Sequence, residues 1–184
     1  MSGVLVAYAS RHGSTREIAE DISKVLYERG VEVVTRAAEE VNDLSPYGAV
    51  ILGSAVYKGD WLLEGTDFLR RFADPLERLP LWLFSSGTAG TVPTETMHDW
   101  THPQLLDSLL TRLQPRGHVL FGGHLDAHRL SVGDWWRYPS LRGVSGDFRD
   151  WGEIEAWANE VANTLPSAAL TLPPKPSRVS KRRG

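Results

Sequence analysis

The chain has no cysteine among its 184 residues. Disulfides, thiolate metal ligands, iron–sulfur clusters and cysteine nucleophiles are therefore excluded. Any redox chemistry has to be carried by a bound cofactor. Hydrophobic runs long enough to cross a bilayer are also missing, and the N-terminal residues lead straight into a strand-like run without the pattern of a signal peptide. These absences predict a soluble, cytoplasmic protein.

Several common catalytic motifs are missing as well. The sequence contains no G-x-G-x-x-G dinucleotide loop, no G-x-x-x-x-G-K-[ST] nucleotide loop and no G-x-S-x-G nucleophile elbow. It also lacks the Asp after the third predicted strand that a response regulator needs. His98 and His102 have the spacing of metal ligands on a helix, but no Glu lies between them and Pro103 follows directly. We therefore expect no metal site.

Positive charge is scarce outside the end of the chain. The net charge is −3, yet five basic residues fall within the last ten positions, so the remainder is more acidic than the total indicates. Because phosphate contacts need clustered Lys and Arg, a nucleic-acid-binding surface on the folded part is excluded. From residue 166 onward, Pro, Ser and basic residues replace hydrophobic periodicity. We predict one domain over 1–165 and a disordered tail over 166–184, which either solubilises the chain or makes weak contact with anionic lipid.

The body of the chain alternates short apolar runs with segments of helical periodicity. The runs predict strands over 4–9, 31–35, 47–53, 80–85 and 118–123, and the periodic segments predict helices over 14–29, 62–72, 105–113 and 151–165. The third run is continuous, which is typical of a strand buried on both faces of a parallel sheet. Strands alternating with helices predict a doubly wound α/β fold with a five-stranded parallel sheet in the order 2-1-3-4-5.

The first strand ends in a loop rich in hydroxyl groups, and a helix follows at once. Ser10, Ser14 and Thr15 supply hydroxyls, the helix N-terminus supplies backbone N–H groups, and Gly13 lets the backbone approach a ligand closely. This arrangement is typical of a phosphate site. The pattern also fits an ordinary capped helix, with Ser14 or Thr15 as the cap and Glu17 in the first turn.

The pattern Ser-x-x-Gly-Ser-Thr over 10–15 resembles the phosphate loop of the flavodoxin family, which holds FMN with hydroxyls and amides and without a metal. Arg11 and His12 depart from the usual family pattern and either add charge to the site or face solvent. The resemblance covers residues 4–164 and implies a flavodoxin-like fold with FMN as cofactor. It implies that the FMN phosphate is held by the loop residues Ser10, Arg11, His12, Gly13, Ser14 and Thr15.

Two more loops are expected at the same edge of the sheet, where ligands of open α/β sheets bind. In flavodoxins the loop after the third strand contacts the flavin ring, and here it contains Ser54, Ala55, Val56, Tyr57 and Trp61. Either aromatic would lie against the ring, unless it is plain packing beneath the loop. The loop after the fourth strand suits the polar edge of the ring because its residues are small: Ser85, Ser86, Gly87, Thr88, Ala89 and Gly90.

The closest likeness within the family is to bacterial flavodoxin-domain proteins grouped with menaquinone-dependent protoporphyrinogen oxidase, through residues 122–126 and 146–151. One-electron flavodoxins usually place an aromatic in the second and in the third loop, and this third loop has none. One face of the flavin would then be open to a substrate. The resemblance thus implies an FMN-dependent oxidoreductase with a quinone- or porphyrin-like substrate.

Two alternatives to this function stay open at this point. The protein is either a non-catalytic electron carrier that works with a redox partner protein, or a flavodoxin-like sheet that has lost the flavin. The aromatic and basic segment 129–142 suits a flat acidic substrate, or else packs against the edge of the sheet. The sequence also leaves a homodimer open.

Overall fold

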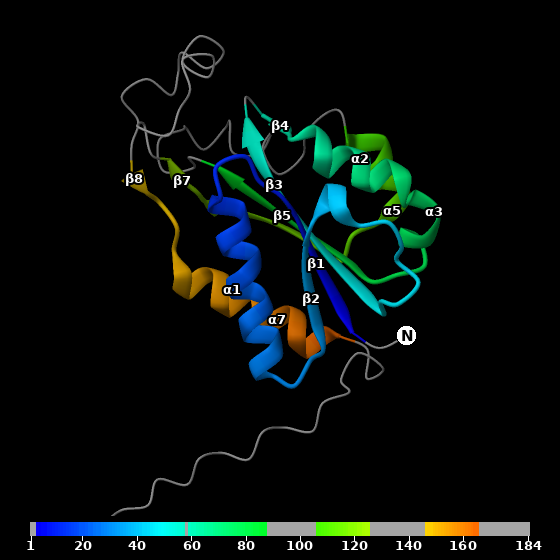
Figure 1. Cartoon of the computed structure of the whole chain (residues 1–184), viewed down its shortest axis with the longest axis horizontal. Helices are drawn as coiled ribbons and strands as arrows, with labels where there is room; N and C mark the ends of the chain where they lie inside the picture. Colours follow the sequence, from blue (N-terminus) through cyan, green and yellow to red (C-terminus); the bar gives the residue numbers. More distant parts are fainter. Residues whose placement is uncertain (1–2, 58, 88–105, 126–145, 166–184) are drawn as a thin grey trace, which may run out of the picture.

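A parallel sheet forms the centre of the computed structural model, which describes residues 3–57, 59–87, 106–125 and 146–165 (Figure 1). Its parallel strands are β1 (Val4–Ala9), β2 (Val33–Ala37), β3 (Ala49–Tyr57), β5 (Leu81–Gly87) and β6 (Gly117–Gly122). They lie in the order β2-β1-β3-β5-β6. Taken in chain order, this is 2-1-3-4-5, so the predicted fold class and strand order are confirmed.

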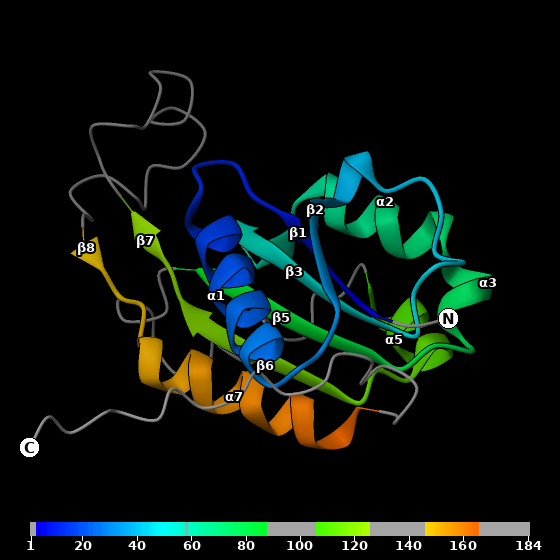
Figure 2. The ribbon, with the colours of Figure 1, turned by 60° about the horizontal axis from the view of Figure 1, so that its bottom comes forward.

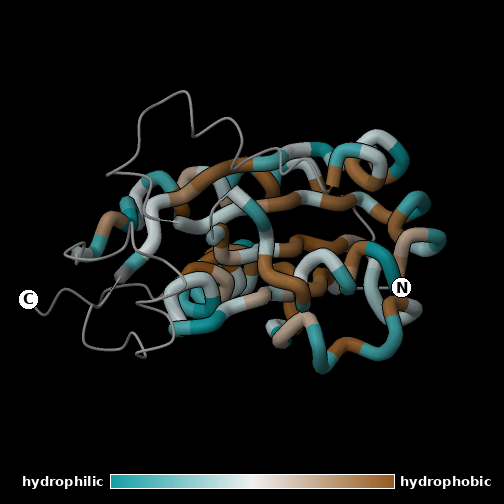
Figure 3. Tube along the Cα trace, turned by 90° about the horizontal axis from the view of Figure 1, so that it is seen from above, coloured by the Kyte–Doolittle hydropathy of each residue, from teal (hydrophilic) through white to brown (hydrophobic). Residues whose placement is uncertain are grey.

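Helices cover both faces of the sheet (Figure 2). One face packs against α1 (Ser14–Glu28) and α7 (Trp151–Thr164). The other face packs against α2 (Leu63–Arg71), α3 (Ala73–Leu76), α5 (Asp107–Leu113) and the short 3-10 helix η1 (Ala38–Glu40). Two separate apolar clusters result, one on each side, and hydrophobic residues concentrate in the strands between them (Figure 3).

Strand β3 is the most deeply buried element. Its residues from Ala49 to Val56 are all buried, which confirms the prediction of a strand covered on both faces. Gly53 lies directly beneath the ring of Phe84 on the neighbouring strand, and a Cβ added there would sit 1.9 Å from the ring Cζ atom. The two strands can pair at this point only because residue 53 has no side chain.

The predicted end of the third strand was wrong. β3 continues past Gly53 and Ser54 to Tyr57, and then turns into β4 (Asp60–Trp61), which pairs with it antiparallel. Ser54 is tolerated inside the sheet because its hydroxyl donates to the Ala55 carbonyl at 3.0 Å and accepts from the Leu62 amide at 3.1 Å. The segment expected as a loop over 54–61 is therefore mostly a hairpin.

The fourth strand is also longer than predicted. The predicted strand ends at Ser85, with Ser86 and Gly87 in a loop, but Ser86 and Gly87 also belong to β5 and pair in register with Phe121 and Gly122 of β6. The buried serines remain in the strand because their hydroxyls find partners on adjacent elements. Thr88, Ala89 and Gly90 lie outside the described residues.

The sequence predicts no strand over 124–149, but the structure has a short strand near each end of this range. β7 (His124–Leu125) and β8 (Gly146–Asp147) pair antiparallel. Segment 129–142 and the tail over 166–184 lie outside the described residues. No helix in the described ranges has the length and apolar character needed to cross a membrane.

We predict that Gly53→Ala strongly destabilises the fold. The added methyl group overlaps the Phe84 ring in a packed core, so we expect the free energy of unfolding to fall by about 3 kcal/mol. Urea unfolding followed by circular dichroism measures this change. Gly117→Ala is the matched control, because a Cβ there meets Trp82 at an ordinary 3.4 Å. Equal stabilities of the two variants would contradict the packing argument.

Candidate functional site

The loop between β1 and α1 lies at the carboxyl edge of the sheet. Gly13 adopts a left-handed conformation with φ +95°, directly before the first residue of α1. The first bond inside the helix is donated by the Glu17 amide to the Gly13 carbonyl at 2.9 Å. Amides that precede this bond point out of the helix N-terminus, where the helix dipole favours an anion. Because the residue at the cap position is Gly13, which has no side chain, no side-chain cap covers the helix start.

Two hydroxyl groups of this loop are oriented so that they can donate a hydrogen bond to a ligand. The Ser10 hydroxyl accepts a hydrogen bond from the Gly13 amide at 3.1 Å, and the Ser14 hydroxyl accepts one from the His124 amide at 2.8 Å. Each oxygen is thus fixed by an incoming N–H group, and its own O–H proton is available for donation. An anion such as a phosphate monoester is the complementary ligand. The residues present therefore fit the phosphate of FMN.

The structure brings the three predicted loops together. The hydroxyl of Thr15, at the start of α1, lies 2.8 Å from that of Ser86 at the end of β5, and both are buried. The rings of His12 and Tyr57 meet edge to face, with centroids 6.5 Å apart. Arg11 is exposed. These contacts join the loop after β1 to the ends of both β5 and β3.

The two candidate aromatics of the second loop lie in different places. Trp61 is only 5% exposed, and its indole N–H donates to the Ser85 hydroxyl at 2.8 Å. Its ring also meets His118 edge to face at 5.6 Å. Trp61 therefore packs inward in this structure, and contact of its ring with a flavin stays a prediction. Tyr57 is half-buried at the end of β3 and remains the candidate for ring contact.

The serines near the ends of β3 and β5 are buried next to the loops. Ser85 lies between Trp61 and His118, whose Nε2 atom is 3.0 Å from the Ser85 hydroxyl oxygen. Ser54, Ala55 and Val56 are buried in β3. Direct contact of these residues with a flavin stays a prediction. His118 was not singled out from the sequence, because nothing in an apolar run distinguishes a histidine that bonds to another strand.

Sequence reasoning also missed an ion-pair network beside the loop. The Arg149 side chain, 6% exposed, bonds to both carboxylate oxygens of Asp147 at 2.7 and 2.6 Å and to Glu17 at 2.5 Å. Its guanidinium also lies 4.5 Å from the centre of the Trp151 ring. The bonds from Arg149 lower the pKa of Asp147 to about 2, and those from Asp147 raise the pKa of Arg149. No local pattern signals this network, because Glu17 and Arg149 are 132 positions apart.

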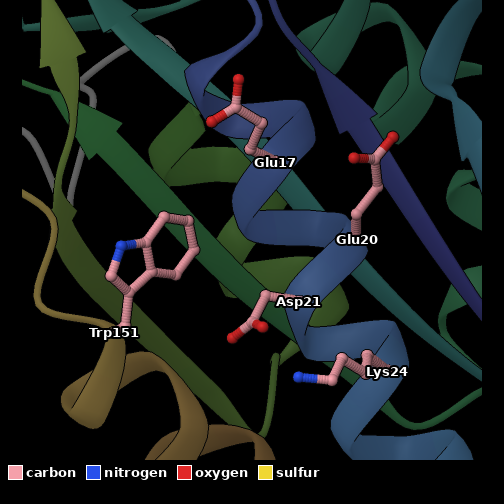
Figure 4. A pocket seen from close by; sticks show the side chains of 5 residues that line it. All are labelled: Glu17, Glu20, Asp21, Lys24 and Trp151. Carbon is pink, nitrogen blue, oxygen red and sulfur yellow. The ribbon is translucent and has the colours of Figure 1, made fainter.

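An open groove of about 400 Å³ runs along α1 next to this ion-pair network (Figure 4). It is lined by Glu17, Glu20, Asp21, Lys24 and Trp151, with Trp151 across from the helix. Burial raises the pKa of Asp21, and repulsion from Glu155 adds to this effect. The groove is acidic and lies outside the three predicted loops. Among the described residues, no cluster of acids and histidines has the arrangement of a metal site.

We predict that Asp21→Asn stabilises the fold above neutral pH. Because the folded-state pKa of Asp21 is raised, its contribution to stability is lost as pH rises through that pKa. At pH 8 the melting temperature of the variant should be up to about 2 °C higher than that of wild type. At a pH below about 4, the pKa of an Asp side chain in the unfolded chain, the two melting temperatures should be equal. Asp43→Asn is the control of opposite sign, since bonds from Ser45 lower the pKa of Asp43. Thermal melts at both pH values measure the difference, and equal shifts for the two variants would contradict it.

Comparison with known proteins agrees with this geometry. The family model described as Flavodoxin domain matches residues 5–135. A curated relative, Protoporphyrinogen IX dehydrogenase [quinone] of Escherichia coli K12, is 21% identical over 180 residues, covering 90% of this chain and 98% of the relative.

Solved structures of flavodoxins share the fold. A flavodoxin of Streptococcus pneumoniae superposes with a TM-score of 0.60 at 17% identity, covering 89% of this chain and all of that one. A rubredoxin:oxygen oxidoreductase of Desulfovibrio gigas superposes with a TM-score of 0.58 at 15% identity, covering 93% of this chain and 38% of that one. Because the family model spans well over half of the chain, the protein belongs to the flavodoxin domain family and is a redox flavoprotein whose cofactor is FMN.

Proposed function

We propose that this protein is an FMN-dependent oxidoreductase whose substrate is a porphyrinogen or a quinone. The observation that carries the proposal is the similarity to Protoporphyrinogen IX dehydrogenase [quinone], which extends over 98% of that enzyme. A match of that extent includes the segments around the site as well as the sheet. The absence of an aromatic residue from the sequence over 85–91 supports it, because a substrate then has access to one face of the flavin.

The chain's own residues would bind and orient the cofactor. The hydroxyls of Ser10 and Ser14, together with the amides at the start of α1, would donate to the FMN phosphate. Thr15, bonded to Ser86, would hold this loop at the end of β5. Tyr57 would lie against the ring, and the small residues after β5 would approach its polar edge. When bound, FMN supplies the electron-transfer chemistry, and the protein supplies binding and electrostatics.

A second candidate function is that of an electron carrier. It is favoured by the superposition on flavodoxins, one of which is covered over its whole length. The same phosphate site would serve both functions. What separates them is whether the open flavin face meets a small molecule or the surface of a redox partner protein.

We predict that Gly13→Asp abolishes FMN binding. The substitution places a carboxylate where the phosphate would lie, and it forces a side chain onto a backbone with φ +95°. Gly30→Asp is the matched control, because Gly30 has a similar φ of +82° at the other end of α1. We expect FMN, followed by its absorption after desalting, to be retained by the Gly30 variant alone. Retention by the Gly13 variant would contradict the phosphate-site assignment.

We predict that the FMN-loaded protein oxidises protoporphyrinogen IX when menadione is the acceptor and oxygen is excluded. The fluorescence of the porphyrin product measures the rate, and protein from which FMN has been removed gives the background. A fluorescence increase no faster than that of free FMN would argue for the carrier function. An anaerobic dithionite titration then tests the carrier directly, since a carrier takes up its electrons in separate one-electron steps.

A further inference from the structure

We propose that Arg149 is a positioning residue for the FMN phosphate, because it neutralises the Glu17 carboxylate that stands beside the phosphate loop. The inference rests on the proposed assignment of that loop. It assigns a role to a residue that lies far from the loop in the sequence and that would not itself contact the flavin ring.

Glu17 stands in an unfavourable place for an anion site. It occupies the first turn of α1, and its Oε1 atom lies 3.9 Å from the position that a Cβ on Gly13 would take. A carboxylate in this turn interacts well with the helix dipole when no ligand is present. A phosphate bound at the same helix start is repelled by it, because two like charges a few ångströms apart oppose each other even near the protein surface. The site therefore needs a nearby positive charge.

Arg149 supplies that charge in a fixed position. Its Nη1 atom bonds to Glu17, while its Nε and Nη2 atoms bond to the two oxygens of Asp147. The Trp151 ring packs against the guanidinium. A guanidinium that is 6% exposed is costly to bury, and it is held here by carboxylates on two different elements. The result is a permanent positive charge bonded to Glu17, beside the first turn of α1.

The same segment is tied to the phosphate loop by a second route. The His124 amide of β7 donates to the Ser14 hydroxyl, and β7 pairs with β8, which carries Asp147. The Phe148 amide donates to the Gly123 carbonyl at 3.0 Å. The positions of Arg149 and of a phosphate-binding hydroxyl are thus set by one small unit of structure, β7 with β8.

The proposal predicts an order of FMN affinities that follows local charge. Glu17, Asp147 and Arg149 together carry one excess negative charge. Arg149→Met raises the excess to two, Glu17→Gln removes it, and the double variant restores it to one. We expect about a tenfold weaker FMN affinity for Arg149→Met, a tighter affinity than wild type for Glu17→Gln, and a near wild-type affinity for the double variant.

The experiment compares FMN with riboflavin, which has the same ring and no phosphate. Quenching of flavin fluorescence on binding gives the dissociation constant of each ligand at low salt. We expect the charge order for FMN and unchanged riboflavin affinity in every variant. Arg112→Met is the matched control: Arg112 on α5 also bonds to two carboxylates, those of Asp74 in α3 and of Glu77 at the end of α3, away from the loop. It should leave both affinities unchanged.

Three results would overturn the proposal. They are a double variant that binds FMN as weakly as Arg149→Met, a parallel loss of riboflavin affinity, and a Glu17→Gln variant that binds FMN no more tightly than wild type. Glu17 is 44% exposed, so its variant tests the charge effect even if Arg149→Met does not fold. Equal affinity of the wild-type protein for FMN and riboflavin would instead contradict the phosphate-site assignment itself.

Discussion

The pairing of β3 between β1 and β5 is the constraint on which the rest of the structure depends. In that register Ser54 lies between Ala9 and Ser85, so the ends of the three strands form one continuous edge. Both faces of β3 are covered by apolar clusters. Gly53 permits this pairing beneath Phe84. The loops that meet at the edge are therefore positioned by the core rather than by contacts of their own.

Serines at the strand ends connect this core to the loops. Ser54 accepts from the Leu62 amide, Ser85 accepts from the Trp61 indole, and Ser86 bonds to Thr15. A buried hydroxyl without a partner costs about 1–3 kcal/mol, so each serine favours the one loop conformation that satisfies it. In a sheet made mostly of apolar residues, these serines orient the flanking segments.

Charge distinguishes the site from its surroundings. The chain is acidic overall, and the groove along α1 is lined by three carboxylates. At the proposed site, the phosphate of FMN would be bound at the start of the same helix against that background. The hydroxyl donors of the loop, the helix dipole and the buried Arg149 guanidinium would act together there, and a surface lysine would be screened too strongly to replace the guanidinium. Under this proposal, FMN binding by this chain depends on an arginine that is far from the loop in the sequence.

Local sequence patterns determined the strands, the helices, the doubly wound fold and the order of the sheet, because hydrophobic periodicity and connection handedness are properties of short segments. They also predict the phosphate loop, since Ser10, Gly13 and Ser14 are neighbours in the chain. Only the tertiary structure decided that β3 and β5 run on through their serines, because those hydroxyls are satisfied by distant partners. It alone decided that Trp61 packs inward and that Arg149 pairs with Glu17. Such contacts join residues that are far apart in the sequence, and no periodic pattern of residues predicts them.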